Sequence, residues 1–191
     1  MSGSIHPLER LVTTLRYLDV EFEVVERPDV LWVGCADYAD CNHGEPDIPA
    51  TLKRYREELI DIVKNELVNP DWSASLSINY DCSDKPCGIM FAQETSSNRQ
   101  DERYDLFTQP GGLWLRLLND YNAAALLGKE NAEPYEYFAD AQILQKAAEA
   151  NGYIQNPEIH VQVEYHCHAE YATPPHKNYA YIPIIQADTG Q

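Results

Sequence analysis

The segment IHVQVEYHCH, residues 159–168, places acidic, amide and imidazole side chains at alternate positions. An alternation with a period of two is typical of a β-strand, whose successive side chains point to opposite faces. The polar face of this predicted strand carries His160, Gln162, Glu164, His166 and His168. A carboxylate among imidazoles can pair with a cation, bind a metal or transfer a proton. A strand with one solvated face would show the same pattern, so this simpler interpretation also stays open.

Two kinds of chemistry other than cation binding use the same segment. His160, Glu164, His166 and His168 could together coordinate zinc or another divalent metal, which prefers imidazole and carboxylate ligands. Side chains two residues apart on a strand lie ~6.5–7 Å apart, which is wide for ligands of one ion. A nucleophilic Cys167 is disfavoured, because the period of two points it away from the flanking histidines. We therefore expect neither a metal nor another cofactor.

A carboxylate taken out of water needs a partner, because burying it alone costs several kcal/mol, and a lipophilic cation supplies charge and apolar area together. Aromatic walls would each add cation–π attraction of ~0.5–2 kcal/mol. Trp32 and Trp114 occupy equivalent places in two similar segments and are the first candidates for opposing walls. Tyr38, Tyr80 and Tyr181 are the second candidates. Packing in the core is the alternative for each tryptophan, and the sequence does not decide between them.

The elements that must position these residues follow from periodicity. Leucines at positions 8, 11, 15 and 18 recur at spacings of three and four, so residues 5–19 are predicted to form an N-terminal amphipathic helix. Residues 20–34 predict two short strands interrupted at Pro28, and residues 51–67 predict a helix with one apolar face. Two further strands are expected at 73–80 and 88–93. The first of them would place Ser77 and Asn79 opposite Glu164.

The second part of the chain repeats this order after residues 94–103, which contain no apolar residue and predict a solvated connection. The strand near Leu31, the helix after Pro49 and the strand at 73–81 recur about 82, 85 and 87 residues later. Two βαββ units related by a pseudo-two-fold axis would form one α+β domain. We expect an antiparallel sheet with the helices on one face and a ligand groove on the other.

Composition limits the classes of partner. The 191 residues include 31 acidic and 14 basic side chains, which gives a net charge of −17. Such an acidic protein is repelled by nucleic acids and by anionic membranes, so we expect neither as a direct partner. No apolar run of ~18 residues and no signal-peptide pattern is present, which predicts a cytoplasmic protein. The five cysteines are odd in number and are expected to be free thiols.

The order of several segments resembles the GyrI-like family, also known as the AraC effector-binding or SOUL-like drug-binding fold. The segments that carry the resemblance are FEVVERPDVLWVG at 22–34, SINYD at 77–81, GGLWLRLLND at 111–120, VEYHCH at 163–168, TPPHKN at 173–178 and YAYIPI at 179–184. The resemblance covers roughly residues 21–186. It implies a domain over 21–191, with repeat halves at about 21–94 and 104–186, preceded by a helical extension over 1–20.

The family resemblance also implies a small-molecule pocket with a glutamate of the penultimate strand facing aromatic rings, and Glu164 matches that position. Many members have an aromatic residue two positions after the acid, where this chain has His166. The implied function is that of a stand-alone protein that binds hydrophobic, cationic or polyaromatic drug-like compounds, by sequestration or sensing. The ligand-binding residues expected are Glu164, Trp32, Trp114, Tyr80, His166, Asn79, Tyr38 and Tyr181.

Two alternative functions stay open. Some GyrI-like proteins are hydrolases that open strained cyclopropane rings of DNA-alkylating compounds. Glu164 would then activate water, while Tyr80 or His166 stabilises the departing phenolate. Other stand-alone members resemble protein inhibitors of a DNA enzyme such as gyrase, and the acidic charge would suit its basic surface.

Overall fold

The structure is a computed structural model that describes residues 6–40, 42–59, 66–80, 84–119, 126–129, 132, 135–140, 142–167 and 178–187. Its strands are β1 (Arg10–Tyr17), β2 (Val20–Arg27), β3 (Val30–Ala39), β4 (Trp72–Ile78), β5 (Cys87–Glu94), β6 (Asp105–Gln109), β7 (Gly112–Asn119), β8 (Tyr153–Gln155), β9 (Val161–Cys167) and β10 (Asn178–Gln186). Its helices are α1 (Ile48–Arg54) and α3 (Ile143–Ala150), with the π-helical turns η1 (Tyr55–Leu59) and η2 (Glu136–Asp140). Within the described chain, no helix has the length and apolar character needed to cross a bilayer.

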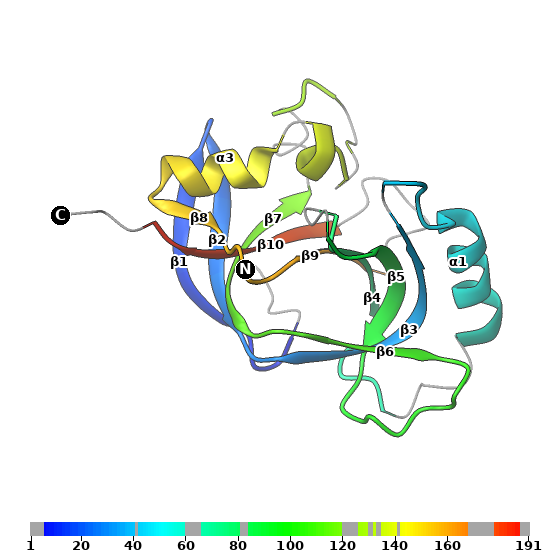
Figure 1. Ribbon diagram of the computed structural model, residues 1–191. Helices are drawn as coiled ribbons and strands as arrows, with labels where there is room; N and C mark the ends of the chain where they lie inside the picture. Colours follow the sequence, from blue (N-terminus) through cyan, green and yellow to red (C-terminus); the bar gives the residue numbers. More distant parts are fainter. Residues whose placement is uncertain are drawn as a thin grey trace.

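The strands form one antiparallel sheet in the order β1-β2-β7-β10-β9-β4-β5-β3-β6, with β8 paired to β10 (Figure 1). Without β1, this order reads the same from either end when β2, β3, β4 and β5 are matched with β6, β7, β9 and β10. A pair of βαββ units would have this arrangement. The predicted antiparallel sheet is confirmed, and the duplication of the two halves stays a prediction.

The sheet curls so strongly that strands far apart in its order touch across its inner face. Arg27 at the end of β2 pairs with Glu94 at the end of β5 at 2.9 Å, although four strands lie between them in the sheet. The rings of Trp32 on β3 and Tyr165 on β9 have centroids 5.4 Å apart across two intervening strands. The curl thus encloses one core, whose buried residues come from β2, β3, β4, β5, β7, β9 and β10.

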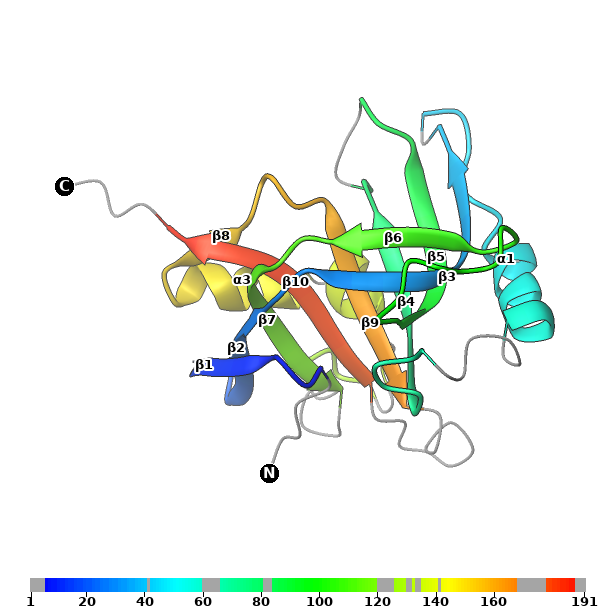
Figure 2. The ribbon, with the colours of Figure 1, turned by 90° about the horizontal axis from the view of Figure 1, so that it is seen from below.

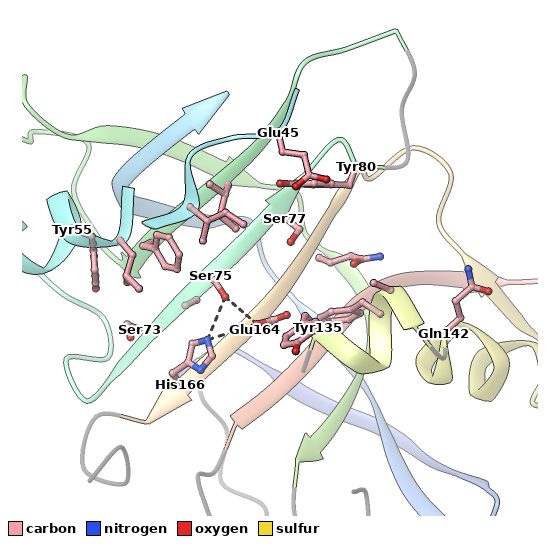
Figure 3. Close-up of a pocket in the computed structure, with 18 of the residues that line it drawn as sticks. Glu45, Tyr55, Ser73, Ser75, Ser77, Tyr80, Tyr135, Gln142, Glu164 and His166 are labelled. Carbon is pink, nitrogen blue, oxygen red and sulfur yellow. Dashed lines mark hydrogen bonds and ion pairs between the residues drawn. The ribbon is translucent and has the colours of Figure 1, made fainter. Parts of the chain in front are cut away.

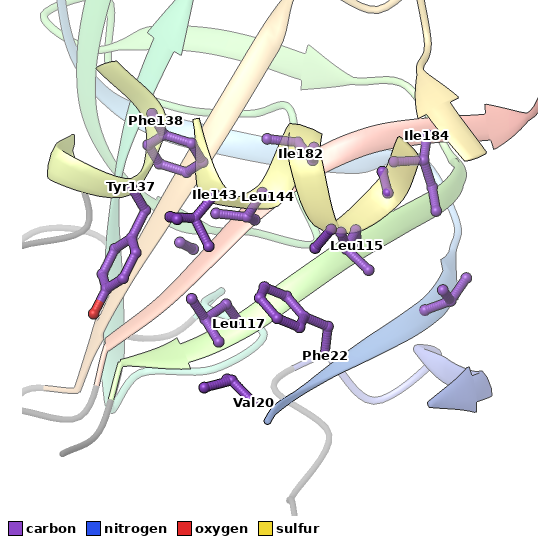
Figure 4. Close-up of a cluster of buried hydrophobic side chains, with 14 of the residues drawn as sticks. Val20, Phe22, Leu115, Leu117, Tyr137, Phe138, Ile143, Leu144, Ile182 and Ile184 are labelled. Carbon is purple, nitrogen blue, oxygen red and sulfur yellow. The ribbon is translucent and has the colours of Figure 1, made fainter. Parts of the chain in front are cut away.

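Both helices lie on the outer face of the sheet, well apart from each other (Figure 2). The apolar side of α3 packs on β2, β7 and β10 through Ile143, Leu144 and Ala147, at the spacing of one helix face (Figure 4). Leu52 of α1 and Tyr55 of η1 pack on β3 and β5. The side chain of Asp47 accepts the N–H of Ala50 at 3.0 Å and so caps the start of α1. Strands β4 and β9 remain between the two helices.

The predicted groove face was wrong. The apolar side of β9, with Val161, Val163 and Tyr165, packs in the curled interior and not under the helices. The helices flank the opposite, polar side, so helices and groove share one face. Periodicity shows which residues share a face, but it does not show which face a helix covers when the sheet encloses its own core.

The predicted N-terminal helix over 5–19 was also wrong, because residues 10–17 form β1 and pair with β2. The β-branched run Val12, Thr13 and Thr14 favours a strand. A β-bulge lies between Leu11 and Thr13, so Leu11 pairs with Val25 and Leu15 with Phe22. Leu18 and Asp19 have φ of 48° and 64°, as a tight hairpin turn requires.

The remaining elements follow the sequence in most cases. The strands expected at 20–34, 73–80 and 88–93 are confirmed as β2, β3, β4 and β5. The helix expected over 51–67 begins earlier, at Ile48, and Leu67 forms an isolated bridge with Thr95. Residues 94–103 were expected to be solvated, but Glu94 and Thr95 are buried, since Arg27 compensates the charge of Glu94.

The expectation that the cysteines are free thiols was wrong for one of the described cysteines. Cys35 and Cys167 form no disulfide, whereas Cys87 is disulfide-bonded. Cys41 and Cys82 lie outside the described residues. An odd number of cysteines means that they cannot all pair within the chain, but it does not exclude one disulfide bond.

A buried ionic cluster ties the N-terminal segment to the inner face. Nε of Arg27 lies 3.1 Å from Oε2 of Glu9, and Nε of Arg116 lies 2.6 Å from Oε2 of Glu23. Arg116 also pairs with Glu9, and its Nη1 donates to the Tyr181 hydroxyl at 3.1 Å. Burial raises the pKa of Glu9, and Arg27 and Arg116 offset part of that rise. Glu9 therefore stabilises two buried guanidinium groups at once.

Replacing Glu9 should destabilise the fold far more than replacing an exposed acid of the same sheet. Glu9→Gln leaves two buried arginines short of charge and should lower the free energy of unfolding by about 3 kcal/mol. Glu26→Gln, in an exposed pair with Arg10, should cost less than about 1 kcal/mol. Urea unfolding measures both variants. Equal losses would show that the buried cluster is not a major source of stability.

Candidate functional site

The pairing of β4 with β9 builds a polar ladder on the outer face. Ser73, Ser75 and Ser77 of β4 lie opposite His166, Glu164 and Gln162 of β9. The predicted polar face is confirmed, but the register differs by two residues, because Ser75 and not Ser77 is opposite Glu164. Asn79 lies beyond the end of β4 with φ of 57°, and its side chain donates to the Pro86 carbonyl at 3.0 Å.

Glu164 lies at the centre of this ladder, in contact with a serine and a histidine (Figure 3). The Ser75 hydroxyl donates to Oε2 of Glu164 at 3.2 Å and lies 3.3 Å from Nε2 of His166. Nε2 of His166 lies 3.9 Å from Oε2 of Glu164, and both side chains are only 15% exposed. Neither of these two neighbours carries a permanent positive charge. The carboxylate, the hydroxyl and the imidazole thus form one polar group at the centre of the ladder.

A cavity of about 1360 Å³ lies over the ladder, between the two helical regions. Its wall on the α1 side is mainly apolar and aromatic, formed by Ile48, Leu52, Tyr55, Ile89 and Phe91, with Glu45 and Arg56 also on this side. Its wall on the α3 side is formed by Tyr135, Phe138, Ala139, Gln142, Gln145 and Glu149. The rings of Tyr55 and Phe91 lie 6.4 Å apart, so they present one continuous aromatic surface. The cavity is large enough for a drug-sized molecule.

Charges around the cavity are mainly negative. Among the described residues that line it, Glu45, Glu149 and Glu164 carry carboxylates, and Arg56 carries the permanent positive charge. Burial raises the pKa of Tyr80, and Glu45 raises it further, which keeps that hydroxyl neutral at the rim. This charge balance favours a cationic ligand over an anionic one.

The structure brings together three of the residues expected at the site, Glu164, His166 and Tyr80. It places Trp32 and Trp114 on the inner face, where both indoles are fully buried and the Trp32 Nε1–H donates to Gln109 at 3.1 Å. The two tryptophans therefore belong to the core and do not form pocket walls.

Two of the tyrosines and Asn79 are also away from the pocket. Tyr181 is buried beside Arg116 on the inner face. Tyr38 is half exposed on β3 and, like Asn79, does not line the pocket.

The aromatic walls that sequence reasoning missed are Tyr55, Phe91, Tyr135 and Phe138. Tyr55 falls within the helix predicted over 51–67, and Phe138 within the helix expected about 85 residues after Pro49, so each is compatible with a buried helix face. A helical period does not separate a side chain that packs in a core from one that lines a cavity beside it.

The described residues do not form the cluster of ligands that the alternative of metal coordination would need. Within the described part of the chain, no three histidine, cysteine or acidic side chains gather as a metal ion would require. His160 lies just before β9, where its carbonyl accepts the N–H of Asn79 at 2.7 Å. His168 lies outside the described residues.

Comparison with known proteins gives a likeness of fold. No family model and no curated protein matches the sequence. A Staphylococcus aureus MU50 protein assigned to bacterial transcription regulation has a TM-score of 0.59 at 12% identity, over 86% of this chain and 98% of the other. The protein SAV2435, solved bound to tetraphenylphosphonium, also has a TM-score of 0.59 at 12% identity, over 87% and 94%.

An integron cassette protein from Vibrio cholerae is also similar, with a TM-score of 0.52 at 9% identity, over 86% of this chain and 95% of the other. Identities this low show a shared fold alone. That fold is consistent with the GyrI-like expectation from the sequence.

Proposed function

We propose that this protein binds small hydrophobic cations in the cavity between α1 and α3, with Glu164 as the charge partner. The observation that carries the proposal is a carboxylate, 15% exposed, on the floor of an aromatic-walled cavity. SAV2435, which shares the fold, was solved with tetraphenylphosphonium, a cation of this class, and this supports the proposal.

The energetics of the cavity favour such a ligand. A largely desolvated carboxylate interacts more strongly with an opposite charge than an exposed one does, because water screens it less. A lipophilic cation loses little hydration on entry and buries apolar area against Leu52, Tyr55 and Phe91. The faces of the aromatic rings also attract a cation through cation–π interactions. Charge and apolar burial thus act on the same molecule.

We further propose that the chain forms a GyrI-like module that acts by sequestration or sensing, with its two repeat halves within residues 21–186. The palindromic strand order supports two repeat halves. The hydrolase and the inhibitor of a DNA enzyme remain alternatives from the sequence, and no specific geometry favours either over binding.

Glu164→Gln should weaken binding of tetraphenylphosphonium or rhodamine by ~1–3 kcal/mol, about 5- to 150-fold, since it removes one desolvated ionic interaction while keeping the side-chain shape. Thermal stability should change little. Isothermal titration measures the affinity, with Glu158→Gln, an exposed acid outside the cavity, as the matched control. Equal affinities of wild type and Glu164→Gln would refute the role of this carboxylate.

Affinity for a permanently charged cation should increase as the pH is raised across about 5–8, the range in which histidines lose their proton. A protonated His166, 3.9 Å from Glu164, would compete with the ligand for the same carboxylate. Titrations at several pH values test this competition. His166→Ala should flatten the profile, and a flat profile in the wild type would show that the two residues are not coupled.

A further inference from the structure

We infer that the ligand has two parts, an apolar cation on the α1 side of the cavity and a neutral hydrogen-bonding arm, amide or hydroxyl, on the α3 side. This inference rests on the proposed function and adds a second subsite to it. The two halves of the cavity differ in chemistry, and this difference separates the two parts of the ligand.

Every amide side chain that lines the cavity among the described residues belongs to one half. Gln142 and Gln145 come from the start of α3, Gln155 from β8 and Gln162 from β9. The α1 half presents mainly aliphatic and aromatic groups, together with the charged side chains of Glu45 and Arg56. In Figure 3, Glu164 lies between Tyr55 on the α1 side and Gln142 on the α3 side. A ligand that reaches both halves therefore meets apolar surface, then the carboxylate, then amides.

Gln145 offers a buried acceptor in the amide half. Its Nε2 donates to Oε1 of Gln155 over 3.4 Å, a long hydrogen bond. Its own Oε1 is buried and has no hydrogen-bond partner among the residues that the structure describes. Because this oxygen is closed off from solvent, a ligand reaches it only when the Gln145 side chain turns toward the cavity, and a ligand N–H or O–H would stabilise that turn.

The amide of Gln142 adds donors to this half of the cavity. Gln142 precedes the helix with φ of 51° and ψ of 41°, and its side chain makes no capping hydrogen bond. Donors and acceptors together suit a group that is both, such as a primary amide.

A second cation is the competing occupant of this half, because Glu149 also lines it. Glu149 is exposed, so solvent screens its charge. The buried group in this half is the neutral Gln145 acceptor. We therefore assign a neutral arm.

Three triphenylphosphonium cations test the inference. Their fourth substituents are a pentyl chain, a chain of similar length ending in a primary carboxamide, and one ending in an ammonium group. The carboxamide compound should bind wild type about 3- to 10-fold tighter than the pentyl compound, the range for one net hydrogen bond. Gln145→Leu should abolish this preference, because the variant offers no acceptor to the carboxamide. Gln162→Leu is the second variant, should Gln145→Leu fail to fold.

The outcomes distinguish a failure of the proposed arm subsite from a failure of the proposed function. Equal binding of the pentyl and carboxamide compounds to wild type would overturn the subsite while the proposed function stands. Tighter binding of the ammonium compound than of the carboxamide would also overturn it, in favour of a dication. Failure of all three to bind would refute the proposed function and the subsite together. Glu164→Gln should weaken the pentyl and carboxamide compounds by the same factor.

Discussion

The antiparallel register of β4 and β9 determines where every part of the site lies. It sets Ser75 opposite Glu164 and directs both outward, while Leu76 and Tyr165 point into the curled interior. Because strand side chains alternate, a slip of one residue would turn Glu164 into the core and Tyr165 out to the cavity. The apolar inner face makes such a slip costly, so the packing of the core fixes the position of the carboxylate that we propose to bind the ligand.

The curl of the sheet links the two faces. On the inner face, Arg27 joins β2 to Glu94 of β5, and Glu9 joins the N-terminal segment to two buried arginines. On the outer face the helices stand apart over different strands and leave the β4–β9 ladder accessible between them. A flat sheet could bury its apolar side chains only if helices covered its middle as well as its two ends. The enclosed inner core removes that need and leaves room for a cavity.

The sequence predicts the ladder and the acid better than it predicts the walls. Alternation along β9 placed Glu164 and His166 on its polar face, and the family resemblance singled out Glu164 as the acid of the pocket. The tryptophans were misplaced, since Trp32 and Trp114 are as compatible with a core as with a pocket until the curl is known. The leucine spacing over residues 8–18 suggested a helix where β1 pairs with β2, and the register of β4 against β9 depends on contacts between distant segments. Local patterns thus reveal faces, whereas register, curl and cavity depend on tertiary packing.

A crystal structure of the protein with (4-bromophenyl)triphenylphosphonium would test the central claim most directly, because the anomalous signal of bromine locates the ligand even where its electron density has an ambiguous shape. The account predicts the phosphonium centre above the β4–β9 ladder, next to the Glu164 carboxylate and with a phenyl ring against Tyr55 or Phe91. A ligand bound elsewhere on the protein, with the cavity over Glu164 unoccupied at saturating concentration, would contradict it.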